Sequence, residues 1–203
     1  MELREALSHI AEIRARVAVM EGFRGYRAVP VGASGVLAVV AALAQPLLVP
    51  DPAADLGGYL ALWLSTAVAG AAAAGSGIWW RWRQVHQPLS QQLTRLAVAQ
   101  FLPCLAAGGL VTLVVARHAP EVGWMLPGLW QVLFSLGIFA SCRLLPKPIV
   151  AVAIFYLLCG TLNLALRNTA SGYAPWGMAV PFGLGQLATA GILYWHLERD
   201  DDE

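Results

Sequence analysis

Residues 57–83 read GGYLALWLSTAVAGAAAAGSGIWWRWR, and no charged side chain occurs in this stretch before Arg81. About 20 apolar residues, each rising ~1.5 Å along a helix, cross the ~30 Å hydrocarbon core of a bilayer. The run ends in tryptophans and arginines, which is typical of a helix that leaves the lipid on the cytoplasmic side. The stretch therefore predicts a membrane-spanning helix over residues 57–80.

The composition of the whole chain agrees with this prediction. Of its 203 residues, 58% are hydrophobic and only 12% are charged, whereas a soluble domain carries roughly 25% charged residues. A net charge of +1 gives no basic surface for nucleic acid. The other apolar runs complete an all-α, polytopic membrane protein of six transmembrane helices, with spans at about 29–49, 57–80, 96–116, 124–142, 149–166 and 176–197.

Residues 1–27 form a separate region in front of the predicted bundle of residues 28–203. Apolar side chains recur there at intervals of three and four, which predicts an amphipathic helix on the cytoplasmic side. Two interpretations stay open. The helix lies among the lipid headgroups, or its apolar face docks a partner or a second copy. That face is formed by Leu3, Ile10, Ile13, Val17 and Met20.

The distribution of positive charge predicts the orientation. Of the thirteen Lys and Arg residues, Arg117 and Arg167 fall on one side of the predicted bundle, and all the others fall on the side of both termini. Cytoplasmic segments carry the excess of Lys and Arg, so we expect both termini in the cytoplasm. The connections between spans are too short for a soluble catalytic domain, so function must lie in the bundle, at its ends or in the N-terminal helix.

One short motif raises the question of catalysis. Residues 32–35 read GASG, which matches the GxSG string of rhomboid intramembrane proteases. Ser34 would need a histidine base within hydrogen-bond reach. The four histidines lie outside the predicted spans or, as His196 does, at the inner interface, so we expect no catalytic site and interpret Gly32-Ala33-Ser34-Gly35 as a packing face. The histidines are His9, His86, His118 and His196.

We expect neither cofactor nor metal. His86 and His196 lie at the edge of the predicted bilayer, whereas haem ligands between membrane helices lie buried at matching depth. The chain has three cysteines and no CxxC pair, so we expect free thiols that pack as small apolar residues.

Amides are the polar side chains inside the predicted spans, where we find no ionisable group that would mark ion coupling. Gln131, Asn163 and Gln186 are candidates for lining a pore or cavity. Gln186 ends the string PFGLGQ, in which Pro181 and two glycines could break the helix and open carbonyls to a cavity. The other interpretation is an amide hydrogen-bonded to a neighbouring helix. The remaining amides in the spans are Gln45 and Gln100.

Four strings carry a resemblance over nearly the whole chain: FRGYRAVPVG (23–32), QFLPCLAAGGL (100–110), MLPGLWQVLFSLGIFASCRLLP (125–146) and YWHLER (194–199). They are similar to those of a group of small bacterial multi-pass membrane proteins for which no activity is known. The resemblance implies a protein of the bacterial inner membrane and assigns no functional residue.

Two function classes follow. The first is a non-enzymatic structural, regulatory or assembly component of the membrane, which acts through the N-terminal helix and the inner loops. Its partners would be the lipid bilayer and either a second copy or another membrane protein, with no nucleic acid. The alternative is a channel or carrier for a small neutral or apolar solute.

Overall fold

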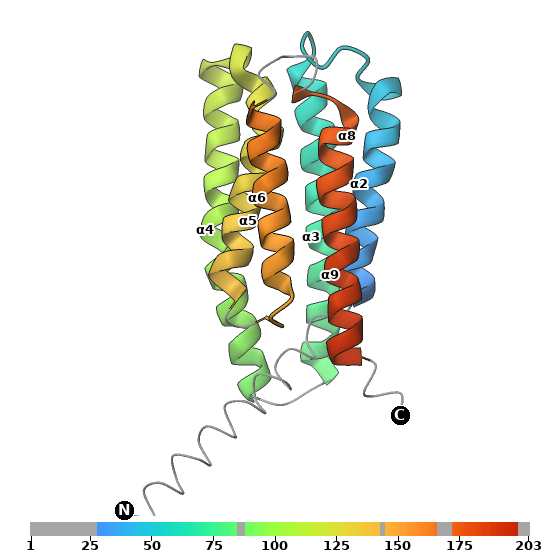
Figure 1. The fold of residues 1–203 in the computed structure, drawn as a ribbon, viewed down its shortest axis with the longest axis vertical. Helices are drawn as coiled ribbons and strands as arrows, with labels where there is room; N and C mark the ends of the chain where they lie inside the picture. Colours follow the sequence, from blue (N-terminus) through green and yellow to red (C-terminus); the bar gives the residue numbers. More distant parts are fainter. Residues whose placement is uncertain (1–27, 85–87, 143–144, 166–171, 199–203) are drawn as a thin grey trace, which may run out of the picture.

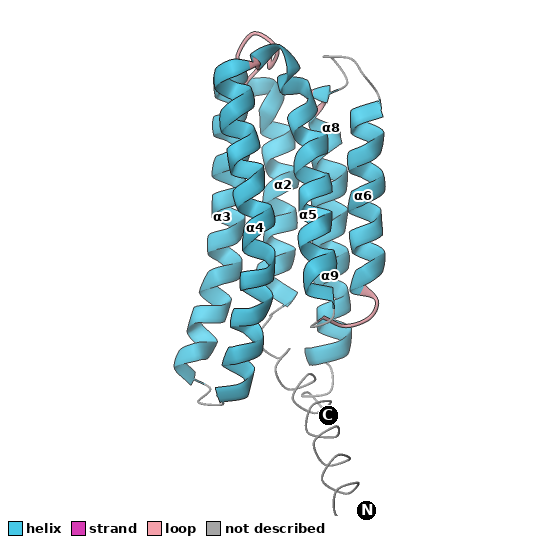
Figure 2. Ribbon diagram, turned by 90° about the vertical axis from the view of Figure 1, so that its left-hand side faces the viewer, coloured by secondary structure: helices cyan, strands magenta, loops and turns pink. Residues whose placement is uncertain are grey.

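The computed structural model describes residues 28–84, 88–142, 145–165 and 172–198. Nearly all of these residues are helical and none of them forms a strand (Figure 2). The prediction of an all-α chain is thereby confirmed. The predicted amphipathic helix of residues 1–27, with its apolar face, lies outside the described residues.

The described helices run up and down beside one another, and the first begins at the same end of the bundle at which the last one finishes (Figure 1). Their order is α2 (Ala28–Leu48), α3 (Leu56–Gln84), α4 (Pro88–His118), the 3-10 turn η2 (Pro120–Met125), α5 (Leu126–Ser141), α6 (Ile149–Ala165), α8 (Pro175–Met178), the π-helical η4 (Ala179–Leu184), α9 (Gly185–Leu193) and the π-helical η5 (Tyr194–Glu198).

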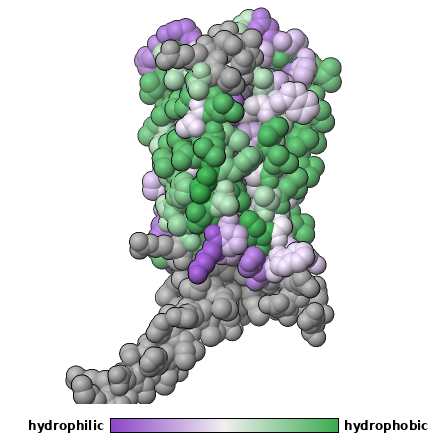
Figure 3. Space-filling model, viewed as in Figure 1, coloured by the Kyte–Doolittle hydropathy of each residue, from purple (hydrophilic) through white to green (hydrophobic). Residues whose placement is uncertain are grey.

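The helices present an apolar surface to their surroundings. Within the part of the chain that the structure describes, five stretches are long and apolar enough to cross a membrane, namely Ala28–Leu48, Leu56–Gly77, Arg95–His118, Pro120–Ser141 and Pro175–His196. The 17-residue α6 is apolar but shorter. On the face that Figure 3 draws, mostly hydrophobic residues cover the middle of the molecule and hydrophilic ones lie toward its two ends. This pattern is that of a helical bundle whose solvent is lipid; the number of spans stays a prediction.

Two helices extend well beyond the spans predicted from hydropathy. α3 continues to Gln84, and α4 begins at Pro88. Hydropathy marks only the lipid-crossing part of a helix, whereas backbone hydrogen bonding can continue into the headgroup region. At its other end α3 is capped, because the Asp55 carboxylate accepts a hydrogen bond from the Gly58 amide at 2.8 Å.

The helices pack in two groups of three. α2 packs mainly against α3 and the last span, while α5 packs against α4 and α6, as Figure 1 shows. Glycines allow the closest approaches. A Cβ placed on Gly160 of α6 would lie 2.8 Å from the Gly128 carbonyl oxygen of α5, and one on Gly35 of α2 would lie 3.0 Å from the Gly183 carbonyl oxygen. The hydrophobic effect does not drive helices together within lipid, so close packing of this kind is needed to hold them together.

The last span, residues 175–198, is not a uniform α-helix. It passes from α8 into η4, returns to an α-helix in α9 and ends in η5. Pro181 lies within η4 and has no N–H with which to continue the backbone ladder. The sequence-based expectation that proline and glycine disturb this span therefore has a structural counterpart in a π-helical segment.

Candidate functional site

Amide side chains from three helices, α2, α5 and α6, converge on the start of the last span. Gln131 of α5 and Asn163 of α6 meet there, with Asn163 Nδ2 donating to Gln131 Oε1 at 3.0 Å. Both side chains also donate to the Gly177 carbonyl oxygen, at 2.7 Å from Gln131 Nε2 and 3.0 Å from Asn163 Nδ2. Gln131 is completely buried. The pair therefore ties α5 and α6 to α8.

Pro181 explains why the Gly177 carbonyl is available. In an α-helix this oxygen would accept a hydrogen bond from the N–H four residues later, and that residue is Pro181. A buried carbonyl without a donor is costly in lipid. The amides of Gln131 and Asn163 replace the missing donor, so they compensate the break in the last span.

A third amide, Gln45, ties α2 and α3 to the turn just before α8. Gln45 Nε2 donates to the Tyr173 carbonyl oxygen at 2.8 Å, and Gln45 Oε1 accepts from Trp63 Nε1 at 3.0 Å. Gln45 is buried, with 2% of its surface exposed. We call these four side chains and the two carbonyls that they bind the amide network: Gln45, Trp63, Gln131, Asn163, Tyr173 O and Gly177 O.

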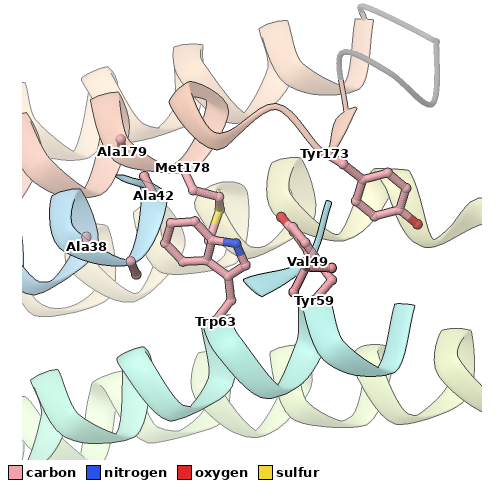
Figure 4. Close-up of a cluster of buried hydrophobic side chains, with 9 residues drawn as sticks. Ala38, Ala42, Val49, Tyr59, Trp63, Tyr173, Met178 and Ala179 are labelled. Carbon is pink, nitrogen blue, oxygen red and sulfur yellow. The ribbon is translucent and has the colours of Figure 1, made fainter. Parts of the chain in front are cut away.

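Aromatic and aliphatic side chains pack around this network. Trp63 extends from α3 toward Met178 at the start of the last span, and Tyr59 lies one turn earlier on α3 (Figure 4). The Tyr59 and Tyr173 rings meet edge to face with their centroids 5.0 Å apart. Burial raises the pKa of the Tyr173 phenol above its ordinary value, so this hydroxyl stays neutral at physiological pH. The environment of the network is therefore largely apolar.

Two phenols in the described part of the bundle are buried without a hydrogen-bond partner. They are the hydroxyls of Tyr59 and Tyr156, and both side chains are completely shielded. Tyr156 packs among Phe134, Phe155 and Phe182. No sequence pattern predicted these groups, because nothing in a helical repeat reports whether a hydroxyl has found an acceptor.

Gln186, the third predicted lining residue, takes no part in the amide network. Its side chain is half-buried and has no hydrogen bond within the described residues. Its Cβ lies 3.0 Å from where a Cβ on Gly35 would stand, so it belongs to the crossing of α2 with the last span. The structure thus brings Gln131 and Asn163 together and leaves Gln186 apart.

An open pocket adjoins the network at the end of the bundle where α2 finishes and α8 begins. Its cavity volume is about 390 Å³. The α2–α3 turn and the turn before α8 form its walls, and the lining residues include Gln45 and Tyr173 from the network. The sequence identifies Gln45 as an amide within a span, but no local pattern connects it to Tyr173, which is 128 residues away.

Ser34 and the three cysteines are further side chains that the sequence analysis considered for chemistry. The Ser34 hydroxyl donates to the Val31 carbonyl at 2.6 Å within its own helix. Cys104, Cys142 and Cys159 are free thiols. Among the residues that the structure describes, no three His, Cys, Asp or Glu side chains gather in a way that could hold a metal ion.

No protein-family model, no curated protein and no solved structure matches this chain.

Proposed function

We propose that this protein is a non-enzymatic structural or assembly component of a bacterial inner membrane, with six spans and both termini in the cytoplasm. The bilayer surrounds the bundle, and a second copy or another membrane protein docks at its cytoplasmic end through residues 1–27 and the inner loops. Membership in the group of multi-pass proteins that the chain resembles is part of the same proposal.

The observation that carries the proposal is how the buried amides are used. Side chains that could bind a solute instead bind Tyr173 O and Gly177 O of the same chain. Hydrogen bonds between membrane helices stabilise them by roughly 0.6–2 kcal/mol each. Together with the glycine-mediated crossings, they favour a bundle that holds one arrangement. A rigid bundle is suited to presenting a docking surface.

The test is to disrupt the predicted docking face and to measure the size of the complex. Ile13→Glu places a charge on that face, and Ala15→Glu places the same charge off it. In mild detergent, we expect Ile13→Glu to release the partner or the second copy and Ala15→Glu to retain it. An unchanged complex in a chain that lacks residues 1–20 would remove the proposal.

A channel or carrier for a small neutral or apolar solute is the second candidate. The observation in its favour is the interrupted last span, since transporters build solute sites at broken helices. Gln131, Asn163 and Gln186 would line the path. In this case Gln186→Leu alters solute flux into liposomes, whereas flux equal to that of protein-free liposomes would contradict a transport function.

A further inference from the structure

α3 and α4 extend past the neighbouring helices at one end of the bundle. A Cβ on Gly77 of α3 would lie 3.0 Å from Pro30 Cγ near the start of α2, yet α3 continues for another seven residues, which is about 10 Å. The hydroxyl of Ser141, the last residue of α5, donates to Ala97 O of α4 at 3.4 Å, although α4 begins nine residues earlier. Figure 2 shows both helices reaching beyond the ends of α5 and α6. We call the paired ends of α3 and α4 the helical extension.

The helical extension is positively charged, and no acidic residue of its own helices neutralises it. Arg81 and Arg83 lie in the last turn of α3, and Arg95 lies two turns into α4. No Asp or Glu occurs between Asp55 and Glu121. The net charge of the whole chain is only +1, so the extension is a local concentration of positive charge.

The three arginines lie at a similar depth. Arg81 and Arg83 follow Gly77 by four and six residues, and Arg95 precedes Ala97 by two. At 1.5 Å per residue, their backbones lie roughly 3–9 Å beyond the level at which α2 begins and α5 ends. The headgroup layer on each side of a bilayer is roughly 5–8 Å thick. The charges of α3 and α4 therefore fall together at the level of the lipid headgroups.

The chemistry of the extension matches an anionic headgroup. A guanidinium binds phosphate through charge-assisted hydrogen bonds, which are often paired. Tryptophan is enriched at the headgroup level, and Trp79, Trp80 and Trp82 all belong to the last two turns of α3. Basic residues next to a membrane surface attract anionic lipids.

α3 and α4 also offer the apolar surface that the acyl chains of a lipid need. They contain the two least buried of the five membrane stretches, with 17% of residues buried in Leu56–Gly77 and 6% in Arg95–His118, against 33–44% in the other three. The two helices pack little against each other. Apolar side chains such as Val68 on α3 and Leu102 on α4 are exposed. A lipid thus has access to both helices.

We propose that the helical extension binds an anionic phospholipid. The positive charge of Arg81, Arg83 and Arg95 holds the phosphate, and the acyl chains lie along the exposed apolar surfaces of α3 and α4. A second copy that docked here symmetrically would place arginine against arginine, so lipid is the better match. The inference rests on the proposed bilayer setting but not on the assembly role of residues 1–27.

The experiment titrates the full-length protein, in a neutral detergent, with dioctanoyl phosphatidylglycerol and counts bound lipid by native mass spectrometry. Dioctanoyl phosphatidylcholine has the same chains without the net charge and is the matched lipid. We expect saturable binding of phosphatidylglycerol, roughly tenfold or more tighter than that of phosphatidylcholine. Raising the salt concentration should weaken it.

Two double variants locate the binding. Arg81→Gln/Arg83→Gln removes two charges from the extension and should weaken phosphatidylglycerol binding by roughly tenfold or more. Arg143→Gln/Lys147→Gln removes two charges from the α5–α6 connection, at the same end of the bundle but outside the extension, and should leave binding unchanged. Arg95→Gln tests the site from α4 and should weaken binding by roughly threefold or more, which keeps the test decisive if the α3 variant fails to fold.

Several results would overturn the proposal. Equal binding of the two lipids, or full binding by Arg81→Gln/Arg83→Gln or by Arg95→Gln, would show that these charges select nothing. Equal losses in the two double variants would assign the effect to the general charge of this end. Displacement of the lipid by an equal concentration of inorganic phosphate would indicate a site for a soluble anion. A dimer that excludes lipid would assign the surface to a second copy.

Discussion

The start of the last span is shaped by one residue, Pro181, which has no backbone N–H. Pro181 cannot donate to the Gly177 carbonyl, and two amides from other helices donate to it instead. The destabilisation caused by Pro181 and the stabilisation contributed by the two amides are therefore coupled. Replacing one changes the free energy that the other contributes.

This coupling can be measured with a double-mutant cycle. Asn163→Leu removes one donor to Gly177 O and the bond to Gln131, so we expect it to lower the free energy of unfolding by about 1–2 kcal/mol. Pro181→Ala restores a backbone N–H, which donates to Gly177 O once this segment relaxes from a π-helix to an α-helix, so the same substitution should cost less in that background. Unfolding in mixed micelles with increasing SDS measures both values. Equal costs in the two backgrounds would contradict the account.

The two kinds of buried aromatic hydrogen-bonding group should respond oppositely to loss. Tyr156 has a hydroxyl without a partner, so Tyr156→Phe should leave the free energy of unfolding unchanged or raise it by up to about 1 kcal/mol. Trp63 donates to Gln45, so Trp63→Phe should lower it by about 1–2 kcal/mol, because Gln45 Oε1 is left without a donor and packing is lost. The same SDS titration compares the two variants, and a larger loss for Tyr156→Phe would show that its hydroxyl has a partner.

At the scale of the elements, glycines decide which helices touch. Gly128 and Gly160 bring the backbones of α5 and α6 together, whereas Gly109 on α4 has open space where a side chain would start. The two environments cannot be distinguished by residue type or by spacing. Only the position of the neighbouring helix separates them.

Gly160→Ala and Gly109→Ala form a matched pair at this scale. A Cβ at position 160 would stand 2.8 Å from the Gly128 carbonyl oxygen, so α5 and α6 must separate, and we expect a loss of about 1–3 kcal/mol in the free energy of unfolding. A Cβ at position 109 meets nothing within 4 Å, so that variant should unfold like wild type. Thermal unfolding in a mild detergent makes the comparison. Similar melting temperatures for the two variants would contradict the packing of α5 on α6.

At the scale of the whole molecule, hydropathy alone anticipated the series of apolar helices. A long uncharged run can satisfy all its backbone hydrogen bonds within itself in lipid only as a helix. The amide network was only partly foreseeable. Gln131 and Asn163 stood out as polar side chains in apolar runs, but their shared partner depends on which helices are neighbours. Gln186, the third candidate for lining a cavity, lies outside the network.

The links made by the Tyr173 and Gly177 carbonyls were not predictable for a similar reason. Tyr173 O binds Gln45, which is 128 residues away, and nothing in either local sequence reports that distance. Pro181 did carry a local signal, because its missing N–H leaves a carbonyl four residues earlier. Which side chains donate to that carbonyl depends on the neighbouring helices, so only the folded bundle shows them.

We propose that the apolar bundle lies in a membrane with its arginine-rich end in the cytoplasm. The most direct test replaces Cys104, Cys142 and Cys159 by alanine and introduces one new cysteine, either Ala54→Cys or His86→Cys. A membrane-impermeant thiol reagent is then applied to intact cells. We predict that the cysteine at position 54 is modified in intact cells. The cysteine at position 86 should be modified only after the cells are opened. Modification at 86 but not at 54 in intact cells would contradict the orientation, and recovery of the chain as a stable monomer in buffer without detergent would contradict the bilayer itself.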